Sequence, residues 1–413
     1  MPFASLKVSG TPEFWDMEKA TQYELQLARR MSRLGTETAF EVLNKARALE
    51  RQGKSIIHLE IGEPDFDTPA NVVEAGVDAM RKGWTHYGPS AGLPDLRQAL
   101  AEYVSRTRGV KVTSDEVVVV PGGKPIIFFT ILSLIDEGDE VIYPNPGFPI
   151  YESMIHYVGG RAVPIQLREE RDFSLDVKEL ASMINDRTRL IIINSPQNPT
   201  GGILERRDVE QIAGAIGDRN IMILSDEIYS RLLFDGGQHF SIMSVPGMQE
   251  RTILLDGFSK TYAMTGWRMG YGVMRPDLAA HMTRLMTNSN SCTASFTQVA
   301  GIEAIRGDQS SVDHMRDEFQ HRRDMFVTGL NKIKGFSCRL PKGAFYVFPN
   351  ITKTGWKSKP LADALLEQAG VAALSGTAFG EYGEGYLRFS VANSTENLQQ
   401  ALDRLDQWTK KNL

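Results

Sequence analysis

The stretch "TILLDGFSK", residues 252 to 260, joins a short apolar run to a serine and a lysine. A run that is apolar on both faces and too short for a helix is typical of a central strand in a covered sheet. Four similar runs precede it: "EVVVV" (116–120), "DEVIYP" (139–144), "RLIIINSP" (189–196) and "IMILSD" (221–226). Helical segments alternate with these runs, which predicts an α/β fold with a mostly parallel sheet covered by helices.

Helix boundaries can be predicted in two places before the first of these strands. Thr68 stands before Pro69 and "ANVVEAGVDAMRKG", where we expect it to cap the helix N-terminus. Pro94 opens "PDLRQALAEYVSRTRG", and Gly109 is expected to end that helix.

Chemically active or aromatic side chains follow all five predicted strands. In open α/β sheets, ligands bind beyond the carboxyl ends of the strands. We therefore expect a ligand site built from the residues at these ends, which are Gly122, Gly123, Lys124, Phe148, Asn198, Asp226, Tyr229, Ser259, Lys260 and Arg268.

Four of these residues indicate a phosphate site. Gly122 and Gly123 precede an apolar helix, and backbone N–H groups at a helix N-terminus bind anions. Ser259 and Arg268 add a hydroxyl and a bidentate cation. A plain tight turn is the alternative for the glycine pair. Neither nucleotide-binding glycine motif is present, so a compact phosphate fits better than a dinucleotide.

Asp226 and Lys260 complete the pattern of a cofactor site. A buried carboxylate at Asp226 needs a cation such as a protonated pyridine nitrogen, although a helix N-cap is an alternative. Lys260 forms a Schiff base only as a free amine, and desolvation with crowding by Arg268 is expected to lower its pKa. A solvated surface lysine is the other interpretation. Phosphate site, carboxylate and lysine together predict pyridoxal 5′-phosphate.

Composition adds few constraints. The chain has 413 residues and a net charge of −5, so it lacks the basic character of nucleic-acid-binding proteins. We predict no nucleic-acid or membrane partner, because no apolar run is long enough to span a bilayer. The seven histidines show no metal-binding spacing. Two cysteines and the lack of a signal-peptide pattern lead us to expect a cytoplasmic protein.

The change of sequence pattern along the chain predicts an N-terminal extension and two domains. Residues 1–34 are expected to be an N-terminal extension, 66–306 a large cofactor-binding domain and 307–413 a small α+β domain. In the last part we expect a helix from Ser310 toward Lys334, strands in "FSCRL", "AFYVFP" and "GYLRFSVA", and a final helix. Residues 35–65, with a strand in "SIIHLEIG", are expected to join this small domain.

From about Thr36 to the C-terminus, the sequence resembles the class I/II aminotransferases of the aspartate aminotransferase superfamily. The motifs that carry the resemblance are "GEPDFDTP" (62–69), "HYGPSAGLPDLRQAL" (86–100), "NSPQNPTG" (194–201), "SDEIYS" (225–230), "SKTYAMTGWRMGY" (259–271) and "YLRFSVA" (386–392). The resemblance implies the type I pyridoxal-phosphate fold and a homodimer with active sites at the subunit interface.

The resemblance also assigns roles to residues that bind the cofactor. Lys260 is similar to the lysine that holds the cofactor as a Schiff base and then moves a proton between Cα and C4′. Asp226 is similar to the partner of the pyridine nitrogen. Asn198 and Tyr229 match the groups that bind the phenolic oxygen. The expected phosphate cradle consists of Gly122, Gly123, Ser259 and Arg268, with Tyr87 reaching the neighbouring subunit's phosphate; simple packing is the alternative for Tyr87.

Other positions concern the substrate. Arg388 is similar to the arginine that binds the α-carboxylate, alongside the Gly62 backbone, although a structural ion pair is the alternative. Phe148 stands where many members stack Trp or Tyr on the ring. Lys124 matches a lysine that binds the distal carboxylate of acidic substrates in the closest bacterial subgroup, but Pro125 replaces the glutamine common there.

These features predict an aminotransferase that acts on aspartate or another acidic amino acid with 2-oxoglutarate. An aminotransferase for alanine or aromatic amino acids is an alternative. A C–S lyase or a cyclopropane-forming synthase of the same fold is another, because fold does not determine reaction. A ligand-sensing regulator is disfavoured, since too few residues precede the fold for a DNA-binding domain. A nicotinamide dehydrogenase lacks its glycine fingerprint.

Overall fold

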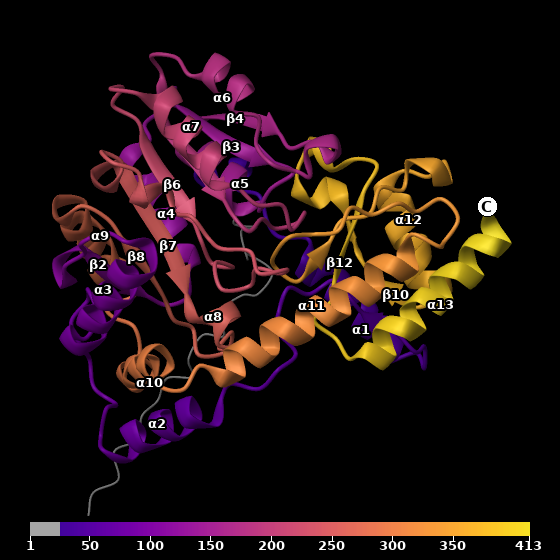
Figure 1. Cartoon of the computed structure of the whole chain (residues 1–413), viewed down its shortest axis with the longest axis horizontal. Helices are drawn as coiled ribbons and strands as arrows, with labels where there is room; N and C mark the ends of the chain where they lie inside the picture. The colour runs from indigo at the N-terminus through magenta and orange to yellow at the C-terminus, as the bar shows by residue number, and fades with distance from the viewer. Residues whose placement is uncertain (1–24) are drawn as a thin grey trace, which may run out of the picture.

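The computed structural model describes residues 25–413, so most of the expected N-terminal extension lies outside the described residues. Its centre is a seven-stranded sheet in the order β2-β8-β7-β6-β5-β3-β4 (Figure 1). The strands are β2 (Val117–Val120), β3 (Glu140–Asn145), β4 (Arg161–Gln166), β5 (Thr188–Asn194), β6 (Met222–Asp226), β7 (Thr252–Gly257) and β8 (Gly270–Val273). All five predicted strands are confirmed.

The sheet is mostly parallel, as predicted, and one strand runs against the others. β8 pairs antiparallel with both β2 and β7. The sequence pattern did not predict β8 or β4. β8 is short and contains two glycines, and β4 contains Pro164, which is tolerated because β4 is an edge strand.

Helices cover both faces of the sheet. Alternate residues of β2 show this division. Val118 and Val120 face the helices of the first layer, where they pack near Ile126. Val117 and Val119 face the helices of the second layer. The first face carries α4 (Lys124–Leu134), α5 (Ile150–Val158) and α9 (Pro276–Ser289). The second carries α2 (Ala70–Arg81), α3 (Pro94–Arg108), α6 (Val177–Met183), α7 (Arg206–Ile216) and α10 (Ser295–Arg306).

The expected end of α3 is confirmed, and one expected cap is wrong. Gly109 adopts φ 66° directly after α3, a left-handed conformation that glycine accepts without strain. Thr68 does not cap α2, because Pro69 is the residue before its first turn. The Thr68 hydroxyl instead donates to the carbonyl oxygen of Ala263, 2.7 Å away.

A smaller group of strands and helices lies beside the sheet (Figure 1). β1 (Ile57–His58) pairs in parallel with β10 (Val371–Ala372), and β12 (Leu387–Ser390) lies between β11 (Leu374–Ser375) and β9 (Tyr346–Val347). The expected strand in "FSCRL" is wrong, since only an isolated bridge joins Ser337 to Asn350. The helices are α1 (Ala39–Glu50), α11 (Ser310–Leu330), α12 (Ser358–Ala364) and α13 (Thr395–Asn412).

Within residues 25–413, no helix combines the length and the apolar character that crossing a bilayer requires.

Candidate active site

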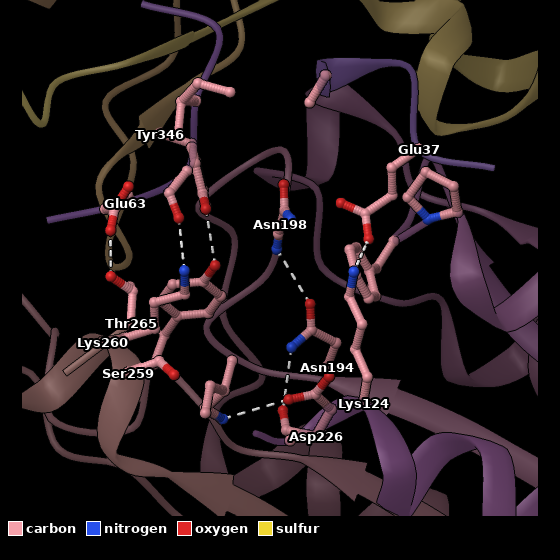
Figure 2. A pocket seen from close by; sticks show the side chains of 18 of the residues that line it. Glu37, Glu63, Lys124, Asn194, Asn198, Asp226, Ser259, Lys260, Thr265 and Tyr346 are labelled. Atoms are coloured by element: carbon pink, nitrogen blue, oxygen red, sulfur yellow. Dashed lines mark hydrogen bonds and ion pairs between the residues drawn. The ribbon is translucent and has the colours of Figure 1, made fainter. Parts of the chain in front are cut away.

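A cavity of about 560 Å³ lies where the carboxyl ends of β5, β6 and β7 meet the smaller part of the chain (Figure 2). The sheet supplies its floor, and residues near β1, β9 and β12 close it from the other side. The predicted site residues that line it are Gly62, Gly123, Lys124, Phe148, Asn198, Asp226, Tyr229, Ser259, Lys260, Arg268 and Arg388.

Lys260 lies on the short helix α8 (Phe258–Thr261), which directly follows β7. Its ammonium points into the cavity and donates to the carbonyl oxygen of Gly62 at 2.5 Å (Figure 2). Burial lowers the pKa of Lys260 to about 8, and the positive charges of Arg388 and Arg268 act in the same direction. The expected crowding by Arg268 is therefore the smaller effect, because Arg388 contributes more. The interpretation as a solvated surface lysine is wrong.

Asp226 ends β6 on the cavity floor and is almost fully buried. Its Oδ2 accepts a 2.6 Å hydrogen bond from the hydroxyl of Tyr151, and its Oδ1 accepts one from the Ile228 backbone N–H. Burial raises the pKa of Asp226 to about 6, while the bond from Tyr151 opposes this rise. A turn rather than a helix follows β6, so the helix N-cap alternative is wrong.

Anion donors gather at the start of α4. Gly123 is the residue before the helix, and Gly122 has φ +78°. A Cβ on Gly122 would lie 2.9 Å from Cζ of Arg268, and together with the left-handed φ this favours glycine where the loop meets the guanidinium. Ser259 lies on the same side of the cavity. A helix N-terminus, a hydroxyl and a guanidinium are together a suitable set of donors for a phosphate.

Arg388 is a buried cation on β12, and 3% of its surface is exposed. It donates to Oδ1 of Asn198 at 3.4 Å and to the carbonyl oxygen of Glu60. Its Nε has no hydrogen-bond partner among residues 25–413. Burial lowers the pKa of Arg388. These contacts are not a structural ion pair, and Arg388 lines the cavity, where its guanidinium is a suitable partner for a carboxylate.

Two tyrosines and two asparagines connect the floor of the cavity with Arg388. The hydroxyl oxygens of Tyr229 and Tyr346 are 2.7 Å apart, and the ring of Tyr346 lies 4.6 Å from Cζ of Arg388. The backbone N–H of Asn198 donates to Oδ1 of Asn194. Both tyrosine hydroxyls stay protonated, because burial raises the pKa of each.

Sequence reasoning missed several polar side chains that line this cavity, among them Tyr151, Tyr346, Asn194 and Glu37. Asn194 begins the motif "NSPQNPTG" and directly ends a predicted strand, so its position was a usable signal. Tyr346 lies in "AFYVFP", where its hydroxyl is the only feature that distinguishes it from its apolar neighbours. Tyr151 lies one helical turn past the predicted loop, and its contact with Asp226 spans 75 positions of sequence.

Two predicted residues do not line the cavity. Gly122 is adjacent to it, behind Arg268. Tyr87 lies outside it on the surface with 89% of its side chain exposed, so packing within its own chain does not explain it.

The donor set fits pyridoxal phosphate in three respects. A buried carboxylate suits the protonated ring nitrogen, an amine of lowered pKa suits the aldehyde, and the donors around Gly122 suit the phosphate. The fold and the cavity are thus those of a pyridoxal-phosphate enzyme that acts on amino acids.

Comparison with known proteins gives the family. The family model for aminotransferase class I and II matches residues 54–405. An aspartate aminotransferase from Pyrococcus horikoshii is 41% identical over 92% of this chain and 96% of its own length. An aromatic-amino-acid aminotransferase from Thermococcus litoralis is 37% identical over 94% and 99%. The aspartate aminotransferase structure from Rhizobium meliloti has a TM-score of 0.90 at 34% identity and covers 94% and 99%.

The chain belongs to the class I and II aminotransferases. It is a pyridoxal-phosphate-dependent transaminase, and the predicted family, fold, activity and cofactor are confirmed.

Proposed function

We propose that the enzyme transfers the amino group of aspartate, or of another acidic amino acid, to 2-oxoglutarate. The observation that carries this proposal is the presence of two cations, Arg388 and Lys124, in one cavity beside Lys260. Arg388 binds the α-carboxylate, and Lys124 is placed to bind a second carboxylate on the substrate side chain. Because both half-reactions use the same site, the kinetics are expected to be ping-pong.

We propose that the residues of the cavity divide the chemistry among them. Pyridoxal phosphate, when bound, supplies the carbonyl that takes up the amino group and the ring that withdraws electrons from Cα. The ionised Asp226 would accept a hydrogen bond from the protonated ring nitrogen, and Asn198 and Tyr229 would donate to the phenolic oxygen. Lys260 Nζ would hold the cofactor at its aldehyde and, as a free amine, would move the proton at Cα of the substrate, for which its pKa of about 8 is suitable.

In this proposal the remaining residues bind and orient. Gly122, Gly123, Ser259 and Arg268 hold the phosphate, while Phe148 packs against one face of the ring. The Gly62 carbonyl, which accepts from Lys260, lies beside the space for the substrate. Phe148 already packs edge-on against Tyr151, with 5.7 Å between the ring centroids, so its ring is supported from behind.

We further propose that the enzyme is a homodimer in the cytoplasm. Tyr87 is 89% exposed and Trp84 and Met80 lie near it in sequence with 42% and 46% exposed, which supports burial of this segment against a second copy. The two cysteines of the chain are unpaired, which fits a reducing compartment.

The division into a small domain of 35–65 and 307–413 and a large domain of 66–306 remains a proposal. The pairing of β1 with β10 supports grouping the first of these segments with the C-terminal part.

A donor screen tests the proposed reaction. The holoenzyme is incubated with single amino acids and either 2-oxoglutarate or pyruvate, and the new amino acid is quantified. Aspartate with 2-oxoglutarate should give glutamate. Arg388→Leu should raise KM for every donor by at least about tenfold, because a buried charged hydrogen bond to the α-carboxylate is lost. Release of ammonia and pyruvate from cystathionine, without glutamate from aspartate, would favour the C–S lyase alternative.

A further inference from the structure

The cation proposed for the distal carboxylate is already paired. Lys124 Nζ forms an ion pair with Oε1 of Glu37, and both side chains line the cavity (Figure 2). Glu37 is 19% exposed and Lys124 45% exposed, so the pair lies at the mouth rather than in the core. Lys124 Nζ also lies 5.7 Å from the ring centroid of Phe148, which places the pair next to the proposed cofactor ring.

Glu37 reaches this position from a segment that crosses the mouth of the cavity. It lies between the 3₁₀ helix η2 (Arg29–Arg33) and α1. Hydrogen bonds hold the segment to α5, and one of them runs from the Ser153 hydroxyl to the carbonyl oxygen of Gly35 at 3.3 Å. The backbone N–H of Gly35 donates to Oγ of Ser153 at 2.9 Å, and Arg33 donates to the carbonyl oxygen of Tyr157 at 3.1 Å. Glu37 is thus placed by the fold.

The other carboxylates near the mouth are used elsewhere. Glu63 accepts a hydrogen bond from Thr265, and Glu60 is bound to His58 at 2.8 Å. Glu37 is therefore the carboxylate that neutralises Lys124, and it occupies the position in which the distal carboxylate of aspartate or glutamate would be bound.

We propose that Glu37 determines substrate specificity as an internal counter-ion: a dicarboxylic substrate displaces it from Lys124, and it stays paired when the substrate side chain is uncharged. This inference rests on the proposed function and names the residue that lets one site accept both kinds of side chain.

The physical argument has two parts. An ion pair that water reaches is weak, so a substrate carboxylate held nearby by Arg388 can replace Glu37 at low cost. With an aromatic or aliphatic side chain in the cavity, an unpaired Lys124 would lose hydration without compensation, and Glu37 removes that penalty. The flexible stem of lysine and its rotatable ammonium group permit both arrangements.

Glu37→Gln tests the proposal, because it removes the charge and keeps the size. We expect kcat/KM for aspartate, glutamate and 2-oxoglutarate to rise about two- to fivefold, the range that a half-exposed ion pair gives. Values for phenylalanine and alanine should not rise, and that for phenylalanine should fall, because its side chain then dehydrates a Lys124 that has lost its counter-ion. Glu41→Gln is the matched control, since Glu41 is exposed on α1 outside the cavity lining.

Lys124→Met gives a second, opposite signature. It should lower kcat/KM for dicarboxylates, because the cation is lost and Glu37 then repels them. The Glu37→Gln/Lys124→Met double variant should recover part of that loss. If Glu37→Gln leaves the ratio of dicarboxylate to neutral substrates unchanged in an active, folded enzyme, the inference is overturned and the proposed function stands. If the unaltered enzyme transaminates no donor, the proposed function fails, and the inference with it.

Discussion

Asp226 and Lys260 have pKa values that burial moves toward neutrality from opposite sides. Burial raises that of Asp226 to about 6 and lowers that of Lys260 to about 8. Each shift has the same origin, the cost of a charge removed from water. Both groups can therefore gain or lose a proton near neutral pH. The hydrogen bond from Tyr151 favours the ionised form of Asp226.

Tyr151→Phe isolates that effect. Loss of the 2.6 Å hydrogen bond destabilises the ionised Asp226, so the proton shared with the ring nitrogen moves toward the carboxylate and the ring withdraws electrons less well. We expect kcat to fall by at least about tenfold, the effect of one hydrogen bond to a charged group, with KM little changed. The pH profile of the cofactor's visible absorption should shift as well, which a purely structural defect would not cause.

Tyr157→Phe is the control for this experiment, because Tyr157 lies on the same helix but outside the cavity lining, and the change keeps its ring. Equal kcat values and superimposable pH profiles for Tyr151→Phe and the unaltered enzyme would show that Tyr151 does not act on Asp226.

The sequence predicted those site residues that follow strands or belong to recognisable motifs. It did not predict Tyr151, Tyr346 or the pairing of Glu37 with Lys124. Each of these depends on a contact between segments far apart in the chain, 75 positions for Tyr151 with Asp226 and 117 for Tyr346 with Tyr229. Local patterns contain no information about which distant residue a side chain meets.

The ends of β6 and β7 are held to α3 by a buried charge network. Arg108 donates to Glu227 at 2.8 Å and to Asp256 at 3.2 Å, and all three side chains are buried. Opposite charge keeps the pKa of Glu227 well below its usual range, despite burial, whereas burial raises that of Asp256 to about 6. Because Asp226 precedes Glu227, this network fixes the end of β6, whose last residue is the carboxylate proposed to bind the ring nitrogen.

Arg108→Met should therefore destabilise the protein strongly. The variant removes the guanidinium from two buried carboxylates, and although Glu227 keeps its 2.9 Å contact with His239, Asp256 loses its cation. We expect the free energy of unfolding to fall by about 3–5 kcal/mol in urea denaturation. Arg106→Met, on the exposed side of the same helix, serves as the comparison and should change it by less than about 1 kcal/mol. Similar unfolding midpoints for the two variants would contradict this role of Arg108.

Strand prediction succeeded where a run was apolar on both faces and failed where pairing decided the outcome. β2, β3, β5, β6 and β7 are such runs. β8 forms a strand because it fits between β2 and β7, a relation that "GYGV" does not reveal. The segment "FSCRL" has the right composition for a strand but finds only one bridging partner at Ser337. Tertiary pairing therefore outweighed local preference in both cases.

Tyr87 lies on the surface away from the cavity of its own chain, as a residue that acts in the proposed homodimer would. In the proposed homodimer each Tyr87 reaches the phosphate in the partner's site. A second cavity of about 690 Å³ is lined by both Arg268 and Met80, which supports an approach to the proposed phosphate cradle from the exposed segment around Met80.

Mixing two inactive or weakened variants tests this arrangement. A heterodimer of Lys260→Ala and Tyr87→Ala chains contains one site with both native residues. We expect activity above the sum of the separate variants after they exchange subunits, with a dimer in analytical ultracentrifugation. Lys260→Ala mixed with the double variant is the control, since no site then holds Lys260. A monomer, or a heterodimer without gained activity, would contradict the shared site.

The most direct test of the central claim, that Lys260 carries the cofactor, is borohydride reduction of the holoenzyme followed by peptide mass spectrometry. The structure predicts that the added mass lies on the peptide that contains Lys260. The amine of Lys260 faces the cavity, and Asp226 lies at the base of that cavity. A label on another lysine, or a protein that takes up no pyridoxal phosphate, would contradict it.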